Sequence, residues 1–170
     1  MNVNTYAHHF LRDCLKGDEI AVDMTIGNGN DTLFLADHCK YVYGFDIQKK
    51  AIEKTGERLK GHYNYRLYLA NHVEVDKYVD KADLFVFNLG YLPHGDSKII
   101  TKADDTLCAF KKAYDLLSKG GLILICFYFH PHGYEEYKKV YDYIDLNDLR
   151  VIGIYREPRP YSPLLYIIRK

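Results

Sequence analysis

The clearest candidates for chemistry lie in the segment 23–31, Asp-Met-Thr-Ile-Gly-Asn-Gly-Asn-Asp, which follows a short apolar run. Gly27 and Gly29 allow the backbone to turn tightly and to approach a ligand closely. Asp46 ends the next apolar segment about twenty residues later, which is where folds of this kind bind ribose hydroxyls. The pattern predicts a nucleotide-binding turn, although two glycines alone could also serve an ordinary turn.

Two nucleotide cofactors could occupy such a turn. A dinucleotide needs its pyrophosphate at a helix N-terminus and a third glycine for close packing, but position 32 is Thr32. Asp23 places a carboxylate beside the turn, which would repel a pyrophosphate and attract the sulfonium and ammonium groups of S-adenosylmethionine. The sign of this charge favours S-adenosylmethionine over NAD. The plain alternative is that Asp23 only stabilises the turn.

A second group of candidates follows the expected strand 84–88. An amide oxygen on Asn88, the last residue of this strand, can accept a hydrogen bond from an amino group and orient it toward a methyl donor. The same site could instead hold the methionine part of the cofactor. Tyr91 could stack on a base, and Asp96 or His94 could take a proton from the acceptor. Each of these three could equally be a packing or solvated loop residue.

These residues need a scaffold that brings strand ends together. Apolar and amphipathic segments alternate almost throughout, which predicts an α/β fold with helices on both faces of a mostly parallel seven-stranded sheet, in a single domain over 1–170. No helix separates the last two strands, so they form a C-terminal antiparallel hairpin. Asp31 or Asn30 is the expected cap of the second helix. The expected helices span about 5–16, 31–39, 47–60, 74–79, 102–117 and 134–145, and the expected strands 20–24, 41–45, 65–70, 84–88, 122–129, 150–155 and 164–168.

Composition and charge exclude several classes of protein. The chain has 170 residues, and its 23 Lys and Arg residues equal its 23 Asp and Glu residues in number. Because the net charge is zero, any binding of nucleic acid must come from a local basic patch. Its four cysteines form no C-x-x-C pair, which favours a reduced, cytoplasmic protein. His130 and His132 lack a visible third ligand, so no metal is expected. The longest apolar run, 122–129, is far below the roughly 20 residues that span a bilayer, so no membrane partner is expected.

The motifs together resemble a known family. The blocks Asp23-x-Thr25-x-Gly27-Asn28-Gly29-x-Asp31-Thr32, Phe45-Asp46-Ile-Gln48 and Phe87-Asn88-Leu-Gly-Tyr91-Leu-Pro93 with Gly95-Asp96 resemble the small class I, Rossmann-like methyltransferase family once labelled rRNA methylases. Members of this family act as tRNA 5-aminomethyl-2-thiouridine methyltransferases. The resemblance covers nearly the whole chain. It implies methyl transfer from S-adenosylmethionine to the aminomethyl nitrogen of uridine 34, the wobble position of tRNA.

The resemblance and the motifs together define the expected site. The expected cofactor-binding residues are Asp23, Thr25, Gly27, Asn28, Gly29, Asp31, Thr32, Asp46, Gln48, Asn71, His72 and Asn88. The expected catalytic residues are Asn88, Tyr91 and Asp96. The expected substrate- and RNA-binding residues are Tyr91, His132, Arg156, Arg159 and Tyr161. The two arginines lie in the last hairpin loop, on the same rim as Asn88, where guanidinium groups can bind phosphate or stack on a base.

Three alternatives stay open at this point. The acceptor could be a small-molecule amine, which the neutral net charge would suit, or rRNA. The domain could also be a non-catalytic nucleotide-binding module of the same fold.

The sequence does not decide between a monomer and a homodimer. The basic helix 47–60 carries interleaved glutamates and is expected to be a solvated, salt-bridged face.

Overall fold

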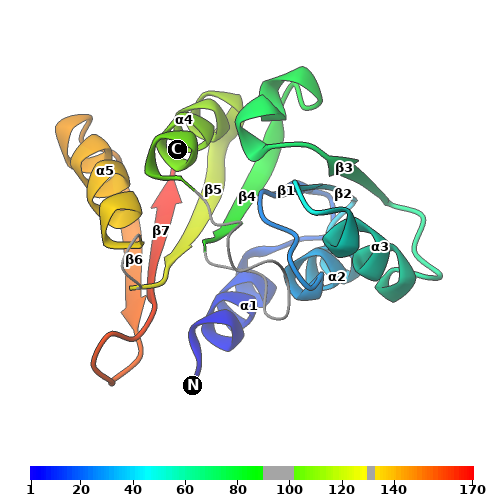
Figure 1. Ribbon diagram of the computed structural model, residues 1–170, viewed down its shortest axis with the longest axis horizontal. Coiled ribbons are helices and arrows are strands. Elements are labelled where there is room, and N and C mark those ends of the chain that lie inside the picture. Colours follow the sequence, from blue (N-terminus) through cyan, green and yellow to red (C-terminus); the bar gives the residue numbers. More distant parts are fainter. Residues whose placement is uncertain (90–101, 130–132) are drawn as a thin grey trace.

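The computed structural model describes residues 1–89, 102–129 and 133–170. Within them, seven strands form one sheet in the order β3-β2-β1-β4-β5-β7-β6 (Figure 1). The strands are β1 (Ile20–Asp23), β2 (Tyr41–Asp46), β3 (Tyr65–Leu69), β4 (Ala82–Asn88), β5 (Leu117–Phe127), β6 (Val151–Arg156) and β7 (Leu164–Arg169). The helices are α1 (Val3–Cys14), α2 (Asn30–His38), α3 (Lys49–Arg58), the 3₁₀ helix η1 (His72–Lys77), α4 (Ala103–Leu116) and α5 (Gly133–Leu146).

The strand directions confirm the predicted sheet. β1 pairs in parallel with β2 and β4, β2 with β3, and β4 with β5. β7 is antiparallel to both β5 and β6, so it is the reversed strand of the C-terminal hairpin. β6 therefore runs in the same direction as β5. The carboxyl ends of β1, β2, β4 and β6 consequently lie on one edge of the sheet, where open α/β sheets bind their ligands.

Helices cover both faces of the sheet (Figure 1). Along β4, Leu84 and Val86 pack with α1 and α2 on one face, whereas Phe85 and Phe87 pack with α4 and α5 on the other. Successive strand residues point to opposite faces, so a central strand must be apolar throughout to be buried on both sides. This is why the continuous apolar runs of the sequence became the central strands.

Some local expectations were wrong. The predicted cap of α2, Asp31 or Asn30, does not form: Gly29 is the residue before the helix, with φ +74°, and no side chain caps it. The Asp31 carboxylate is used in tertiary contacts instead. β5 begins at Leu117 and not at 122, and helix 74–79 is a 3₁₀ helix that starts at His72. Across the described ranges, no helix is long and apolar enough to cross a membrane.

Candidate active site

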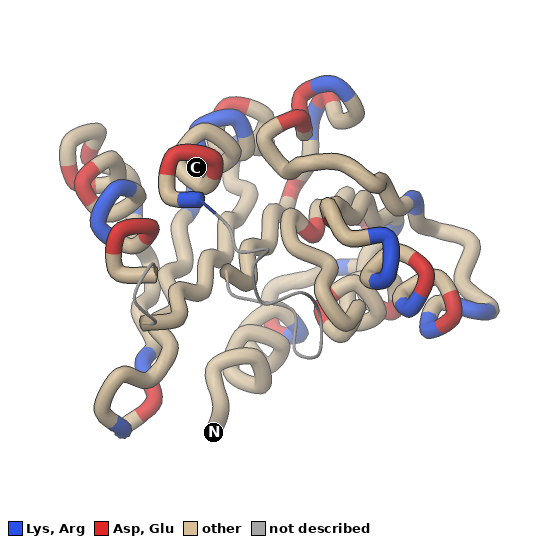
Figure 2. The backbone as a smooth tube through the Cα atoms, in the orientation of Figure 1, with Lys and Arg blue, Asp and Glu red and all other residues tan. Residues whose placement is uncertain are grey.

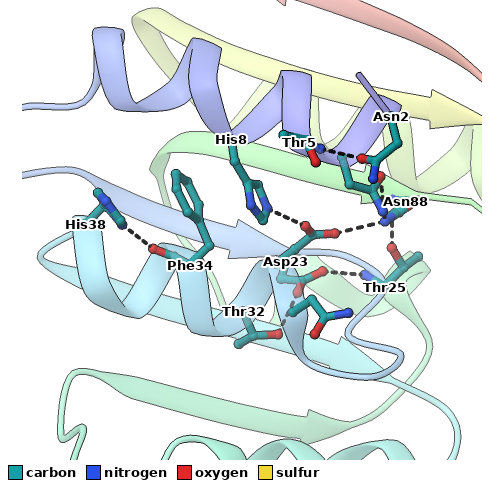
Figure 3. Close-up of polar contacts among 12 residues, drawn as sticks. Asn2, Thr5, His8, Asp23, Thr25, Thr32, Phe34, His38 and Asn88 are labelled. Atoms are coloured by element: carbon teal, nitrogen blue, oxygen red, sulfur yellow. Dashed lines mark hydrogen bonds and ion pairs between the residues drawn. The ribbon is translucent and has the colours of Figure 1, made fainter. Parts of the chain in front are cut away.

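Thr25 joins the ends of β1 and β4. Its hydroxyl Oγ1 accepts a 2.8 Å hydrogen bond from the backbone N–H of Asn88, and its own N–H donates to Oδ1 of Asp23 at 3.1 Å (Figure 3). Because β1 and β4 are neighbours in the sheet, this bond fixes the turn after β1 against the end of β4. Two of the predicted site residues, Asp23 and Asn88, are therefore held in one rigid arrangement.

Asp23 is completely buried beneath the glycine turn. Besides the bond from Thr25, its Oδ2 accepts a 2.6 Å hydrogen bond from the hydroxyl of Thr32 in α2. Burial, followed by the nearby carboxylate of Asp31, raises the pKa of Asp23 to about 7. The carboxyl group thus supports the turn from below, and a cation bound in the turn would favour its charged form.

Asp46 closes the same turn from the side of β2. Its Oδ2 accepts a 2.9 Å hydrogen bond from the N–H of Gly27, and its Oδ1 accepts one from the N–H of Gln48 at 2.8 Å. Burial raises its pKa, and these backbone bonds oppose that effect. A carboxylate can accept about four hydrogen bonds, so this arrangement leaves acceptor capacity for ribose hydroxyls at the predicted position.

Helix α3 holds the outer side of the turn. Lys54 donates to Oδ1 of Asn28 at 2.6 Å, and Arg58 donates to Oδ1 of Asn30 at 2.7 Å. Elsewhere on α3 basic and acidic residues are interleaved (Figure 2), and Lys49 pairs with Glu53. The helix is therefore salt-bridged, as expected, but one of its faces also anchors the turn.

Asn71 and His72 lie at the start of η1. Asn71 caps this helix by accepting from the N–H of Val73, and its Nδ2 donates to Asp105 at 3.4 Å. His72 is buried, with Nδ1 at 3.3 Å from the carbonyl oxygen of Met24, and its Nε2 has no hydrogen-bond partner in the described structure. Burial lowers the pKa of His72 and keeps the ring neutral. An unpaired, buried ring nitrogen next to the turn after β1 is consistent with a polar ligand there.

Two residues of α1 belong to this site, although the sequence motifs did not indicate them. His8 Nε2 lies 2.7 Å from Oδ1 of Asp31, and Asn4 Oδ1 lies 3.4 Å from Nδ2 of Asn88. Nδ2 of Asn88 also donates to Oδ2 of Asp31 at 2.9 Å. The available signal was the i, i+4 spacing of Asn4 and His8, which puts two polar side chains on the otherwise buried face of an amphipathic helix.

Aromatic stacking and hydrogen bonds hold α1 in place. The ring of His8 stacks on Phe34 of α2, with centroids 4.0 Å apart and planes inclined by 7°. Tyr6 stacks on Tyr155 of β6 at 3.9 Å, and the N–H of Val3 donates to Glu157 at 3.0 Å. α1 therefore bridges α2 and the C-terminal hairpin.

The space between α1 and Asn88 is small. A cavity of about 20 Å³ is lined by the polar residues Asn4, His8, Asp31 and Asn88 and by apolar residues such as Phe34. This volume fits about one water molecule.

The RNA-binding candidates Arg156, Arg159 and Tyr161 lie in or next to the loop after β6, and they differ in their neighbours and in their exposure. The Arg156 guanidinium lies over the ring of Phe129, 5.1 Å from its centroid. Arg159 lies 3.6 Å from the carboxylate of Glu157, which offsets its charge. Tyr161 is 82% exposed and has a φ of +54°. Arg156 and Tyr161 therefore have the better geometry for contact with a base or a phosphate.

Five of the residues singled out in the sequence are not described by the structure. Tyr91, His94, Asp96, His130 and His132 lie outside the described residues, so their expected roles stay predictions. In the described ranges, no three His, Cys, Asp or Glu side chains form a group that could hold a metal ion. All four cysteines are free thiols.

Comparisons with known proteins identify the family of this chain. The family model described as Putative rRNA methylase matches residues 42–163. The chain is 36% identical over 176 residues to an Arabidopsis thaliana protein named tRNA (mnm(5)s(2)U34)-methyltransferase, chloroplastic. That match covers 91% of this chain and 64% of the relative, so the chain spans less than two thirds of the length of this curated relative.

Solved structures agree over the full chain. A putative rRNA-methylase from Clostridium thermocellum superimposes with a TM-score of 0.90 at 35% identity, covering 100% of this chain and 98% of that one. SMU.1697c, a putative methyltransferase from Streptococcus mutans solved in complex with SAH, gives 0.89 at 35% identity with the same coverage. The chain thus belongs to the Putative rRNA methylase family, and its fold and relatives assign it to the S-adenosylmethionine-dependent methyltransferases.

Proposed function

We propose that this methyltransferase acts on the aminomethyl nitrogen of 5-aminomethyl-2-thiouridine at position 34 of tRNA. The name of the Arabidopsis relative supports the choice of nucleoside. The observation that carries the proposal is the orientation of Asn88, whose Nδ2 donates to Asp31. Because a carboxylate only accepts hydrogen bonds, the NH₂ group must face Asp31, and the amide oxygen Oδ1 is turned away from it. That oxygen suits an N–H donor, which an amine acceptor supplies.

The donor side of the reaction rests on the glycine turn. S-adenosylmethionine, when bound, supplies a methyl group on a positively charged sulfur. We propose that Asp46 holds the ribose, that Gly27 and Gly29 allow close approach of the backbone, and that the carboxyl group of Asp23 favours the positive charge. Thr25, Asn28, Thr32, Gln48, Asn71 and His72 complete the proposed cofactor site.

On the acceptor side, the nitrogen attacks only as the neutral amine, because a protonated ammonium has no free electron pair. The ammonium must first release a proton to solvent. The N–C bond would then form as the S–C bond breaks, so that the cofactor would leave as the neutral thioether S-adenosylhomocysteine. The product is a methylated ammonium that carries the positive charge formerly on sulfur. Asn88 contributes by holding the N–H so that the nitrogen lone pair faces the methyl group. Placement of this kind can account for several orders of magnitude in rate.

The nucleic acid would reach this site along the rim formed by the β6–β7 loop. Arg156 lies over Phe129, and Tyr161, in the loop that follows β6, is exposed. Because the chain has no net charge, we expect modest tRNA affinity that depends on a few local phosphate contacts.

The decisive experiment compares acceptors with the purified protein and labelled S-adenosylmethionine. We expect methylation of tRNA that carries 5-aminomethyl-2-thiouridine, detected by nucleoside mass spectrometry, and none of the same tRNA lacking the aminomethyl group. tRNA from a deletion strain should accumulate the unmethylated nucleoside. Methylation of rRNA or of a small-molecule amine, with none of this tRNA, would contradict the proposal.

A further inference from the structure

We infer that Asp31 and His8 are positioning residues for the methyl acceptor: they fix the Asn88 amide so that its oxygen faces the amine. This inference deepens the proposed function and rests on it. Asp31 enters here in a different role from cofactor binding, and His8 brings the N-terminal helix into the reaction. Neither residue is proposed to touch the substrate.

The hydrogen bonds form one continuous chain behind the site. His8 Nε2 lies 2.7 Å from Oδ1 of Asp31, and Oδ2 of Asp31 accepts from Nδ2 of Asn88 at 2.9 Å. The second contact of Nδ2 is Oδ1 of Asn4, at 3.4 Å. Each carboxylate oxygen of Asp31 is thus used by a different neighbour.

The direction of these bonds follows from chemistry. An ionised Asp31 can only accept, so the contacting nitrogens of His8 and Asn88 must donate. Tyr128 donates its hydroxyl to Asn4 Oδ1 at 3.5 Å, so Asn4 also presents an acceptor to Asn88. A flipped Asn88 amide would set its oxygen against two acceptors, and the low local dielectric would make that arrangement costly. Only one amide orientation satisfies all the partners.

His8 can exert this control because its ring cannot turn freely. It stacks on Phe34 at 4.0 Å, nearly parallel, and its exposed side-chain fraction is only 22%. His8 also lines the cavity of about 20 Å³, which has room for about one water molecule. His8 and Asp31 therefore act on the acceptor through Asn88 and not by direct contact.

The two hydrogen bonds also decide which polar group the acceptor meets. His8 occupies one oxygen of Asp31 and Asn88 occupies the other, so the carboxylate is held against side chains of the protein. The pair thus leaves a neutral carbonyl, and not a carboxylate, as the group presented to the amine.

Three variants test the inference. His8→Phe keeps the ring stacked on Phe34 but removes the hydrogen bond to Asp31. His8→Gln restores a donor at about the position of Nε2. His38→Phe is the matched control, because His38 stacks on the other side of Phe34, at 4.3 Å, without contacting Asp31.

Single-turnover methylation of the tRNA substrate at saturating S-adenosylmethionine gives the first readout. We expect His8→Phe to lower the rate about 10-fold or more, as misplacement of a reacting group can, while His8→Gln recovers most of it. His38→Phe should stay near the wild-type rate, and the cofactor Kd should be similar in all four proteins. Equal effects of His8→Phe and His38→Phe, no recovery in His8→Gln, or a defect confined to cofactor binding would overturn the inference.

A second readout does not depend on turnover. In ¹⁵N-labelled protein, the two Nδ2 protons of Asn88 should give separate, slowly exchanging signals that broaden or shift in His8→Phe and stay unchanged in His38→Phe. Unchanged signals in His8→Phe would overturn the inference even if the enzyme methylates tRNA. An inactive wild-type protein whose Asn88 signals respond as expected would instead overturn the proposed function, and with it the positioning of an amine acceptor.

Discussion

A Cβ atom on Gly29 would lie 2.4 Å from Oγ1 of Thr55, so α3 packs directly against bare backbone at the glycine turn. Gly29 also has a φ of +74°, which side-chain-bearing residues rarely adopt. The glycine that the sequence motif assigned to ligand approach is thus equally required by the packing of a helix. Thr55 itself is fully buried.

Gly29→Ala should lower the free energy of unfolding by about 1–3 kcal/mol, because it combines backbone strain with overpacking. Gly56→Ala in the same helix is the control: nothing lies within 4 Å of the added carbon, so it should stabilise the protein by about 0.5–1 kcal/mol. Urea unfolding measures both. Adding Thr55→Ala to Gly29→Ala should restore part of the loss, since it removes the two closest atoms. A Gly29→Ala protein as stable as Gly56→Ala would contradict this account.

Asp46→Ala should weaken S-adenosylmethionine binding more than Asp46→Asn does. The alanine variant loses the acceptor for Gly27 and Gln48 together with the proposed ribose contacts, each charge-assisted bond contributing about 1.5–3 kcal/mol. The asparagine variant keeps an acceptor oxygen. Isothermal titration calorimetry with S-adenosylmethionine and with NAD provides the measurement. NAD binding to the wild type, with none of S-adenosylmethionine, would reverse the cofactor assignment.

The stability of the cofactor-free protein should fall between about pH 4 and pH 7 because of Asp23. Its pKa is raised from 3.8 to about 7 in the folded state, so over this range the folded protein holds a proton that the unfolded chain releases. The proton on Asp23 contributes its full stabilisation below the unfolded pKa of 3.8. This contribution is lost as the pH rises through the folded pKa of about 7.

Asp23→Asn isolates this effect from other titrating groups. The variant keeps an acceptor for the N–H of Thr25 and removes the ionisation, so its stability relative to the wild type should increase from pH 4 to pH 8. Thermal unfolding at several pH values gives the comparison. A difference between the two proteins that is independent of pH would show that Asp23 does not titrate in this range.

Arg156→Ala should raise the KM for tRNA several-fold and leave cofactor affinity unchanged. Arg159→Ala should have a smaller effect, because Glu157 already offsets that charge. Lys138→Ala, which removes a lysine paired with Asp142 on α5, serves as the control for a general loss of positive charge. The salt dependence of KM should be weaker in Arg156→Ala, since each lost phosphate contact reduces the slope. If all three variants match the wild type, tRNA binds to a different surface.

The order of elements and the direction of the strands could be predicted from the sequence. Continuous apolar runs such as 122–127 identify strands buried on both faces, and the absence of a helix between 156 and 164 forces an antiparallel hairpin. Asp23, Asp46 and Asn88 each end a strand, so they could then be placed at one edge of the sheet. Their positions at this edge follow from the strand order and direction alone.

The part of the site contributed by α1 could not be predicted in this way. His8 and Asp31 are 23 positions apart, and Asn4 and Asn88 are 84 apart, so no local spacing encodes their contacts. The same contacts explain the wrong cap of α2, because a carboxylate held by His8 and Asn88 is not available to the helix N-terminus. The motifs also gave no sign that Asp23 would be fully buried. A position next to the turn in the sequence does not determine whether the side chain is buried.

The docking of α1 has a consequence for the order of folding. Val3 and Glu157 are separated by 154 positions, and Tyr6 stacks on Tyr155, so α1 depends on a hairpin that leaves the ribosome long after it. Contacts of such high sequence separation form late and slow the final step of folding. The contacts of α1 with the C-terminal hairpin can form only after the whole chain has been made. The position of His8 is therefore one of the last features of the fold to be fixed.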